Sequence, residues 1–182
     1  MHELSLKLQE FFFEAALATY AGSTSKTSIE GLPCSKGYRY KRGDYLYIDT
    51  YFTNGEQSGG QTIIYLKPEE SPNFIPAWIM QYNGWCEGDD KKVLDFLKEA
   101  LSRTYRMRTF CGGRGKLFGE VSPSGECLEY ANDWKGTFDD FRGVEIISKE
   151  SVPESGVGHE TKNVFWHRYQ GRTLLQEVQQ EK

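Results

Sequence analysis

Long apolar runs are missing from this sequence. None of its segments reaches the ~20 apolar residues that a membrane-spanning helix needs. The first residues also lack the basic start, apolar run and small-residue cleavage site of a secretory signal. The formal net charge of the 182 residues is −4, which gives no general attraction to nucleic acid. We therefore expect a cytoplasmic protein with no membrane contact and no direct DNA binding.

Cysteine and histidine are also scarce. The four cysteines form no C-x-x-C pair, and the three histidines are not spaced with them as metal ligands. In a cytosol, reduced thiols are the rule for such a chain. We therefore predict that the cysteines, including Cys111, are structural, and that the protein holds no metal and no cofactor.

Aromatic residues, in contrast, are abundant. The chain has 11 Tyr, 11 Phe and 4 Trp, although its hydrophobic share is only 38%. Aromatic rings provide large contact areas and flat stacking faces. Such a content suits a tight core, and it suits a ligand cleft equally well.

Two segments of the chain have similar sequences. LQEFFFEAALATYA (residues 8–21) aligns without gaps on VLDFLKEALSRTYR (residues 93–106), and both carry apolar residues at helical spacing. Three strand-like segments follow each helix in the same order, and the pairs are YIDTY with YANDW, GQTII with GVEII, and WIMQYNG with FWHRYQG. A match of several elements in order predicts an internal duplication.

These patterns predict an α+β fold. A helix-strand-strand-strand unit occurs twice, forming a mainly antiparallel sheet with the two helices packed on it. Residues 1–182 would form a single domain made of two repeats, about 1–87 and 88–174, plus a short polar C-terminal tail. The connections are rich in Ser, Gly and Pro, and the Asn54-Gly55 pair predicts a hairpin.

The repeats place polar groups among aromatic ones. Side chains alternate along a strand, so Asp49 lies on one face with Tyr47 and Tyr51. Asn132 falls at the equivalent position of the second repeat. Burying such groups is costly unless they are hydrogen-bonded. Two interpretations stay open: an anchor for backbone donors or tyrosine hydroxyls, which is the commoner role, or recognition of a ligand.

The repeats differ in chemistry at two aligned positions. Glu145 stands where the first repeat has Thr62, and His167 stands where it has Met80. His167 could act as a general base or read a ligand by hydrogen bonding, although a histidine near aromatic rings is more often structural. For Glu145 we expect an ion pair with Arg142 or Arg168.

The segment RTFCGGRGKLFG (residues 108–119) has no clear counterpart in the first repeat. Its glycines would let backbone N–H groups converge on an anion, and Arg114 could add a bidentate contact. The segment lacks the spacing and the Lys-Ser/Thr of a phosphate loop. We favour a flexible turn after the second helix.

Several motifs along the chain resemble those of a known family. FFFEAALATYAG, GDYLYIDTYF, GGQTIIYL, PAWIMQYNG, FLKEAL and FDDFRGVEII resemble the bacterial family known as domain of unknown function 5680, from about Leu8 to Gly171. Members look like stand-alone cytosolic proteins or like the C-terminal half of regulators with an Xre-type helix-turn-helix. The resemblance implies a bacterial or phage origin and a sensor or ligand-binding role, and it brings no catalytic residues. This chain departs from the pattern by having no DNA-reading domain and by having Gln61-Thr62 where the family tends to acidic residues.

The function we predict is a non-enzymatic small-ligand-binding module, either a sensor or a sequestering protein. Its aromatic cleft would take a small planar or nucleotide-like ligand. The expected cleft residues are Tyr47, Asp49, Tyr51, Trp78, Tyr82, Arg114, Tyr130, Asn132, Trp134, Glu145, His167 and Tyr169. Two alternatives stay open. One is a small hydrolase or isomerase using Asp49 or Glu145 with His167, and the other is an interaction module with a protein partner or a homodimer.

Overall fold

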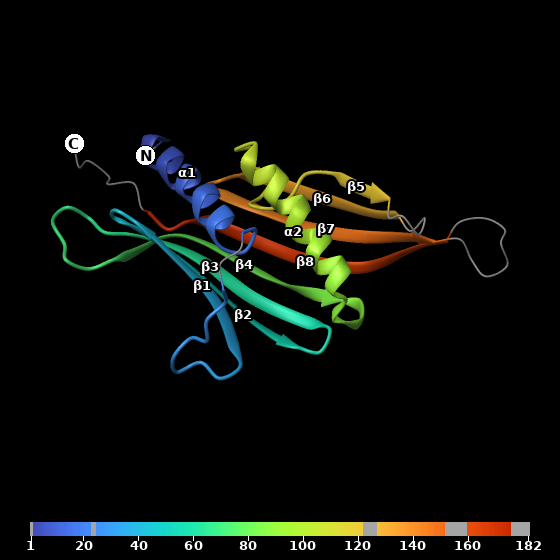
Figure 1. Cartoon of the computed structure of the whole chain (residues 1–182). Helices are drawn as coiled ribbons and strands as arrows, with labels where there is room; N and C mark the ends of the chain where they lie inside the picture. Colours follow the sequence, from blue (N-terminus) through green and yellow to red (C-terminus); the bar gives the residue numbers. More distant parts are fainter. Residues whose placement is uncertain (1, 23–24, 122–126, 152–159, 176–182) are drawn as a thin grey trace.

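The computed structural model describes residues 2–22, 25–121, 127–151 and 160–175 and is drawn in Figure 1. The first half of the molecule comprises α1 (His2–Ala18), β1 (Ser35–Arg42), β2 (Tyr45–Asn54), β3 (Gln57–Leu66) and β4 (Ile75–Cys86). A short 3-10 turn (Glu87–Asp89) leads to the second half, which comprises α2 (Lys91–Arg106), β5 (Phe118–Val121), β6 (Cys127–Thr137), β7 (Asp140–Ser151) and β8 (Glu160–Thr173). The predicted α+β class is confirmed, whereas the polar C-terminal tail beyond residue 175 lies outside the described residues.

All the strands belong to one antiparallel sheet. Its order is β1-β2-β3-β4-β8-β7-β6-β5, so each half is a meander and the two halves meet where β4 pairs with β8. Each half has one strand more than the three we expected, namely β1 and β5. The sequence of β1, SKGYRYKR, is polar at most positions, and β5 has only four residues. Neither therefore shows the apolar alternation that identifies a strand in a sequence.

The hairpin predicted at Asn54-Gly55 connects β2 to β3. Asn54 pairs with Gln57, which leaves Gly55 and Glu56 as a two-residue turn. The φ angle of Gly55 is +58°, in the left-handed region that glycine enters without steric cost. This tight turn sets the register of β3 on β2, and with it the face on which Ser58 lies.

Both helices lie on the same side of the sheet (Figure 1). The ring of Phe12 in α1 lies 5.2 Å from that of Trp78 in β4, and Phe96 in α2 stacks 5.0 Å from Phe118 in β5. Asp90 caps α2 by accepting a hydrogen bond of 2.8 Å from the Lys92 amide. The helices thus cover the apolar face of the sheet and enclose an aromatic core between the two layers.

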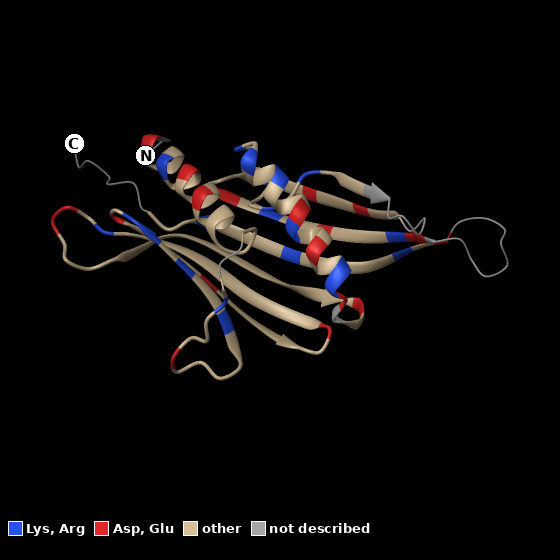
Figure 2. Cartoon of the chain, viewed as in Figure 1, with Lys and Arg blue, Asp and Glu red and all other residues tan. Residues whose placement is uncertain are grey.

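Charged residues lie on the outward surfaces of the helices and on the strands and turns (Figure 2). On α2, Arg103 pairs with Glu99 at 2.7 Å, which is the i,i+4 spacing that supports an exposed helix. No helix among the described residues is long and apolar enough to cross a membrane.

Candidate functional site

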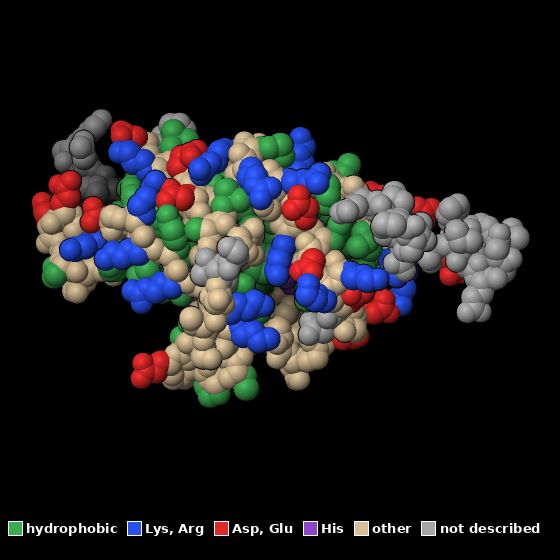
Figure 3. Space-filling view, in the orientation of Figure 1, with side chains coloured by type: hydrophobic (Ala, Val, Ile, Leu, Met, Phe, Trp, Pro, Cys, Tyr) green, Lys and Arg blue, Asp and Glu red, His purple; other side chains and the backbone are tan. Residues whose placement is uncertain are grey.

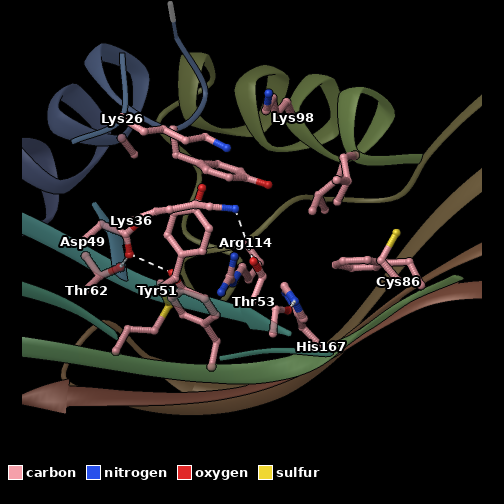
Figure 4. Close-up of a pocket in the computed structure, with 18 of the residues that line it drawn as sticks. Lys26, Lys36, Asp49, Tyr51, Thr53, Thr62, Cys86, Lys98, Arg114 and His167 are labelled. Atoms are coloured by element: carbon pink, nitrogen blue, oxygen red, sulfur yellow. Dashed lines mark hydrogen bonds between the residues drawn. The ribbon is translucent and has the colours of Figure 1, made fainter. Parts of the chain in front are cut away.

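A pocket of about 200 Å³ opens between the helices and the sheet, with most of its lining from the first half. In Figure 3, Lys and Arg side chains gather around a hollow in the middle of this face, and a histidine shows within it. Lys26, Lys36 and Lys98 line the pocket from the segment after α1, from β1 and from α2. Figure 4 shows Asp49, Arg114 and His167 deeper, toward the sheet. We call the three lysines the mouth of the pocket, and we call the deeper polar side chains of Asp49, Arg114 and His167 its floor.

Arg114 comes from the loop 107–117, between α2 and β5. Residues 111–115 of this loop are buried against the second half. Tyr105 donates to the Gly113 carbonyl, the Gly115 amide donates to the Tyr130 hydroxyl, and the Asn132 amide donates to the carbonyls of Cys111 and Gly115, each at 2.9 Å. The segment is a turn, but it is buried and held by these four hydrogen bonds. The flexible turn that we favoured does not describe it.

The buried loop aims the Arg114 guanidinium into the pocket. The side chain is 6% exposed, and its charged plane lies 4.7 Å above the ring of Tyr82 and 5.6 Å from that of Tyr169. Nη1 lies 3.5 Å from Glu145 Oε1. Among the described residues, Nε and Nη2 have no hydrogen-bond partner. Buried donors without acceptors are costly, so Arg114 carries two unsatisfied nitrogens beside the pocket that it lines.

Burial, the largest single effect, acts to lower the pKa of Arg114, but Glu145 together with Tyr105, Tyr82 and Tyr130 raises the pKa of the guanidinium above its ordinary value. Burial also acts on Glu145, where it would raise the pKa. The charge of Arg114 and the hydrogen bonds from His167 and Tyr130 outweigh that effect and hold the pKa of Glu145 below its ordinary value. Arg114 and Glu145 therefore form a buried ion pair beside the pocket.

Asp49 accepts two hydrogen bonds, from the Thr62 hydroxyl and from the Tyr82 hydroxyl, each at 2.9 Å. It is 4% exposed, and it also lines the pocket. Burial raises its pKa, while the two hydrogen bonds and the charge of Arg114 act in the opposite direction. Asp49 therefore both anchors Tyr82 and presents a polar group to the pocket. The two interpretations of this residue do not exclude each other.

Three further side chains form a hydrogen-bonded chain beside Arg114. His167 Nδ1 lies 3.1 Å from Glu145 Oε1, and His167 Nε2 lies 3.0 Å from Ser58 Oγ. Glu145 is fully buried and also accepts a bond of 2.7 Å from the Tyr130 hydroxyl. Burial lowers the pKa of His167, and its bond to Glu145 only partly offsets this. Glu145 is ion-paired with Arg114 and hydrogen-bonded to His167, so the expected pairing with Arg142 or Arg168 is wrong.

The structure separates the expected site residues into two groups. Those that line the pocket are Tyr47, Asp49, Tyr51, Tyr82, Arg114 and His167. Those that do not are Trp78, Tyr130, Asn132, Trp134, Glu145 and Tyr169. Trp78 is fully buried in the core, where its indole donates to the Phe138 carbonyl at 2.9 Å. The loop 107–117 lies near the others. For example, a Cβ on Gly112 would be 2.7 Å from the Tyr169 hydroxyl.

The pocket also contains residues that sequence reasoning missed, among them the three lysines of the mouth and Ser58. The lysines are far apart in the sequence and share no motif. Ser58 lay in a segment interpreted as a hairpin connection, whereas the tight turn at Gly55 makes it part of β3. Only its position within the strand would have indicated that it faces the pocket.

No group of three or more metal-ligating side chains occurs among the described residues. The family model described as a domain of unknown function (DUF5680) matches residues 49–157. No curated protein and no solved structure matches the chain significantly.

Proposed function

The chain belongs to the DUF5680 family, to which no function is assigned, and we propose from its site that it binds a small organic anion. The observation that carries this proposal is Arg114. Its guanidinium is buried, charged and directed into a pocket, and two of its nitrogens have no partner among the described residues. A planar guanidinium with free N–H groups is the side chain best suited to a carboxylate or a phosphate.

The charges around the pocket support an anion. Four cationic side chains line it, Lys26, Lys36, Lys98 and Arg114, against the two carboxyl groups of Asp49 and Glu56. Glu56 is exposed and accepts hydrogen bonds from the Trp85 indole and the Gly88 amide, so its charge is partly engaged elsewhere. Lysines at the mouth of a cleft raise the local concentration of anions, an effect that salt screens.

The walls support a ligand with a flat apolar part. Tyr20, Tyr47, Tyr51, Tyr82 and Tyr105 line the pocket. Their rings offer stacking faces, and Asp49 offers an acceptor for a donor edge of the ligand. A nucleotide-like molecule, with a planar base and a phosphate, combines these features, and the protein would serve as its sensor or sequester it. A concave, partly buried site favours this role over the alternative of a flat protein-interaction surface.

We also infer that the two halves arose by duplication. The element order supports this, since a helix and four strands occur twice. Two aligned hydrogen bonds support it further. Tyr82 donates to Asp49 as Tyr169 donates to Asn132, and Thr19 donates to the Ala15 carbonyl as Thr104 donates to the Ala100 carbonyl.

The test is a thermal-shift screen followed by calorimetry. The panel contains nucleoside monophosphates and aromatic carboxylates, each paired with its neutral counterpart such as the nucleoside or the amide. A ligand that binds the native state raises its stability by RT ln(1 + [L]/Kd). We expect shifts for anions and none for the neutral counterparts, with binding weakened by added salt.

Matched lysine variants sharpen this test without disturbing the core. Lys98→Gln removes a charge that lines the pocket, and Lys92→Gln removes one that is exposed on the same helix and does not line it. We expect the first change to weaken anion binding several-fold, consistent with the ~0.2–1 kcal/mol of a partly exposed ion pair. The second should leave affinity unchanged. Equal affinities for charged and neutral compounds would refute the proposal.

A further inference from the structure

One row of residues crosses the centre of the sheet and carries a reactive arrangement. In the ladders, Ser58 of β3 pairs with Gly84 of β4, Gly84 pairs with His167 of β8, and His167 pairs with Glu145 of β7. Residues paired in this way point to the same face. Ser58 and His167 therefore flank Gly84 on the face that lines the pocket.

Gly84 is the reason that Ser58 and His167 can meet. A Cβ on Gly84 would lie 1.9 Å from the Trp166 carbonyl oxygen and 2.3 Å from Cδ2 of the His167 ring. Since glycine has no side chain, the imidazole lies over β4 and reaches Ser58 on the next strand. The result is the 3.0 Å contact between His167 Nε2 and Ser58 Oγ.

The direction of each hydrogen bond follows from charge. Glu145 is ionised, held so by Arg114, and a carboxylate only accepts. His167 Nδ1 must therefore carry the proton in the 3.1 Å contact with Glu145. Burial lowers the pKa of His167 and so favours the neutral imidazole. With the proton on Nδ1, Nε2 bears a lone pair that can accept from the Ser58 hydroxyl 3.0 Å away. A serine that donates to a histidine oriented by a carboxylate is the arrangement of an activated nucleophile.

We propose that Ser58 is the nucleophile of an acyl-transfer reaction, with His167 as its general base and Glu145 as the positioning residue. Ser58 Oγ would form a bond to the carbonyl carbon of an ester while its proton passes to His167 Nε2. Collapse of the tetrahedral intermediate breaks the bond to the alcohol, which takes the proton from His167. Water then attacks the acyl-serine in the same way, which releases the acid and restores Ser58. The only co-reactant is water.

Lys36 of β1, held by Thr53 of the intervening strand β2, supplies a cation for the developing oxyanion. Thr53 of β2 lies directly opposite Ser58 in the ladder, and the Lys36 ammonium donates to the Thr53 hydroxyl at 3.2 Å. A positive charge placed where negative charge develops is the usual way to stabilise such an intermediate. The substrate class, a small ester that carries an anionic group, rests on the function proposed above for the pocket.

The test uses a neutral fluorophosphonate probe, because its reaction with serine needs no anion recognition. Ser58 Oγ would displace fluoride at phosphorus, and His167 would take the proton. We expect intact-mass and peptide analysis to find one adduct, on Ser58. It should be absent from Ser58→Ala and present at wild-type rate in Ser148→Ala, whose exposed hydroxyl bonds instead to Asn163.

The histidine is tested separately. In a His167→Gln variant shown to be folded by circular dichroism, labelling should slow by about 10²–10⁴-fold, the usual contribution of a general base. An absence of adduct on Ser58 in the wild-type protein would overturn the proposal. Labelling that His167→Gln leaves unchanged would do the same.

Anion binding by Ser58→Ala separates the two proposals. If this variant and the wild type bind anions equally and the wild type shows no adduct on Ser58, the pocket function stands and the reaction does not. If the wild type is labelled on Ser58 but neither protein binds anions, Ser58 is the nucleophile and the anionic substrate class is wrong.

Discussion

The two halves of the molecule differ in what lies over the corresponding face of the sheet. In the second half, the loop 107–117 follows α2 and lies buried on the sheet, tied to Tyr130 and Asn132. In the first half, the segment after α1 returns to β1 through a bridge between Thr27 and Gly37, and the pocket stays open beside it. One half thus covers its polar face with its own backbone, and the other has a pocket over that face.

The comparison also shows how one half serves the other. The loop that covers the second half carries Arg114, and its side chain reaches across the centre into the pocket. At the aligned positions Thr62 and Glu145, the first half has a hydroxyl that donates to Asp49, whereas the second has a carboxylate that holds Arg114. The open half depends on the covered half for its cationic floor.

The largest effect should come from breaking that dependence. Arg114→Met leaves Glu145 fully buried without its cation, and an uncompensated buried charge costs about 3–5 kcal/mol. Urea unfolding measures the loss of stability. The double variant Arg114→Met/Glu145→Gln removes both charges and should recover most of it. A single variant as stable as the wild type would show that Arg114 does not compensate the buried charge of Glu145.

A smaller effect should distinguish the aligned tyrosines of the two halves. Tyr130→Phe removes a hydroxyl that donates to the Glu145 carboxylate and accepts from the Gly115 amide. The loss of a hydrogen bond to a charged group costs about 1.5–3 kcal/mol. Tyr47→Phe removes a buried hydroxyl close to Thr19 and Thr62, so about 1 kcal/mol is expected. Equal losses in urea unfolding would mean that the covering loop adds nothing.

The smallest effect concerns Asp49, and it depends on pH. Its folded pKa lies above the ordinary value of 3.8, so its contribution to stability is present below pH 3.8 and is lost as pH rises through the folded pKa. Asp49→Asn cannot ionise and keeps the acceptor for Thr62 and Tyr82. The stability of this variant relative to wild type should therefore increase from acid to neutral pH.

The matched change in the second half should behave differently. Asn132→Asp replaces the amide that donates to the Cys111 and Gly115 carbonyls with a group that only accepts. It should destabilise the protein at neutral pH, where the new carboxylate faces two carbonyl oxygens. A pH-independent difference for Asp49→Asn in urea titrations that run from below pH 3.8 to neutral pH would contradict the assignment.

Much of the architecture was readable in the sequence, because helices and hairpins depend on local periodicity and turn chemistry. The α+β class, both helices, the hairpin at Gly55 and the strands around Asp49 and Asn132 were all predicted. The strands β1 and β5 were not, since one is polar and the other short. Their place in the sheet comes from pairing with a neighbour.

The site was readable only in part. Alternation along the strands correctly grouped Tyr47, Asp49 and Tyr51, because side-chain direction in a strand is a local property. Which aromatic face is covered and which is open depends on where a loop lies, and that is a matter of long-range packing. The burial of Arg114 and its approach to Glu145 are of this kind.

By itself, the sequence determined the family, the fold class and the polar positions among aromatics. The tertiary structure alone decided that Ser58, Gly84, His167 and Glu145 form one row. These residues lie on four strands from both halves, and no local pattern fixes the pairing of β4 with β8. That pairing arises because both halves bury their apolar faces under the helices, and it brings the serine and the histidine within one hydrogen bond.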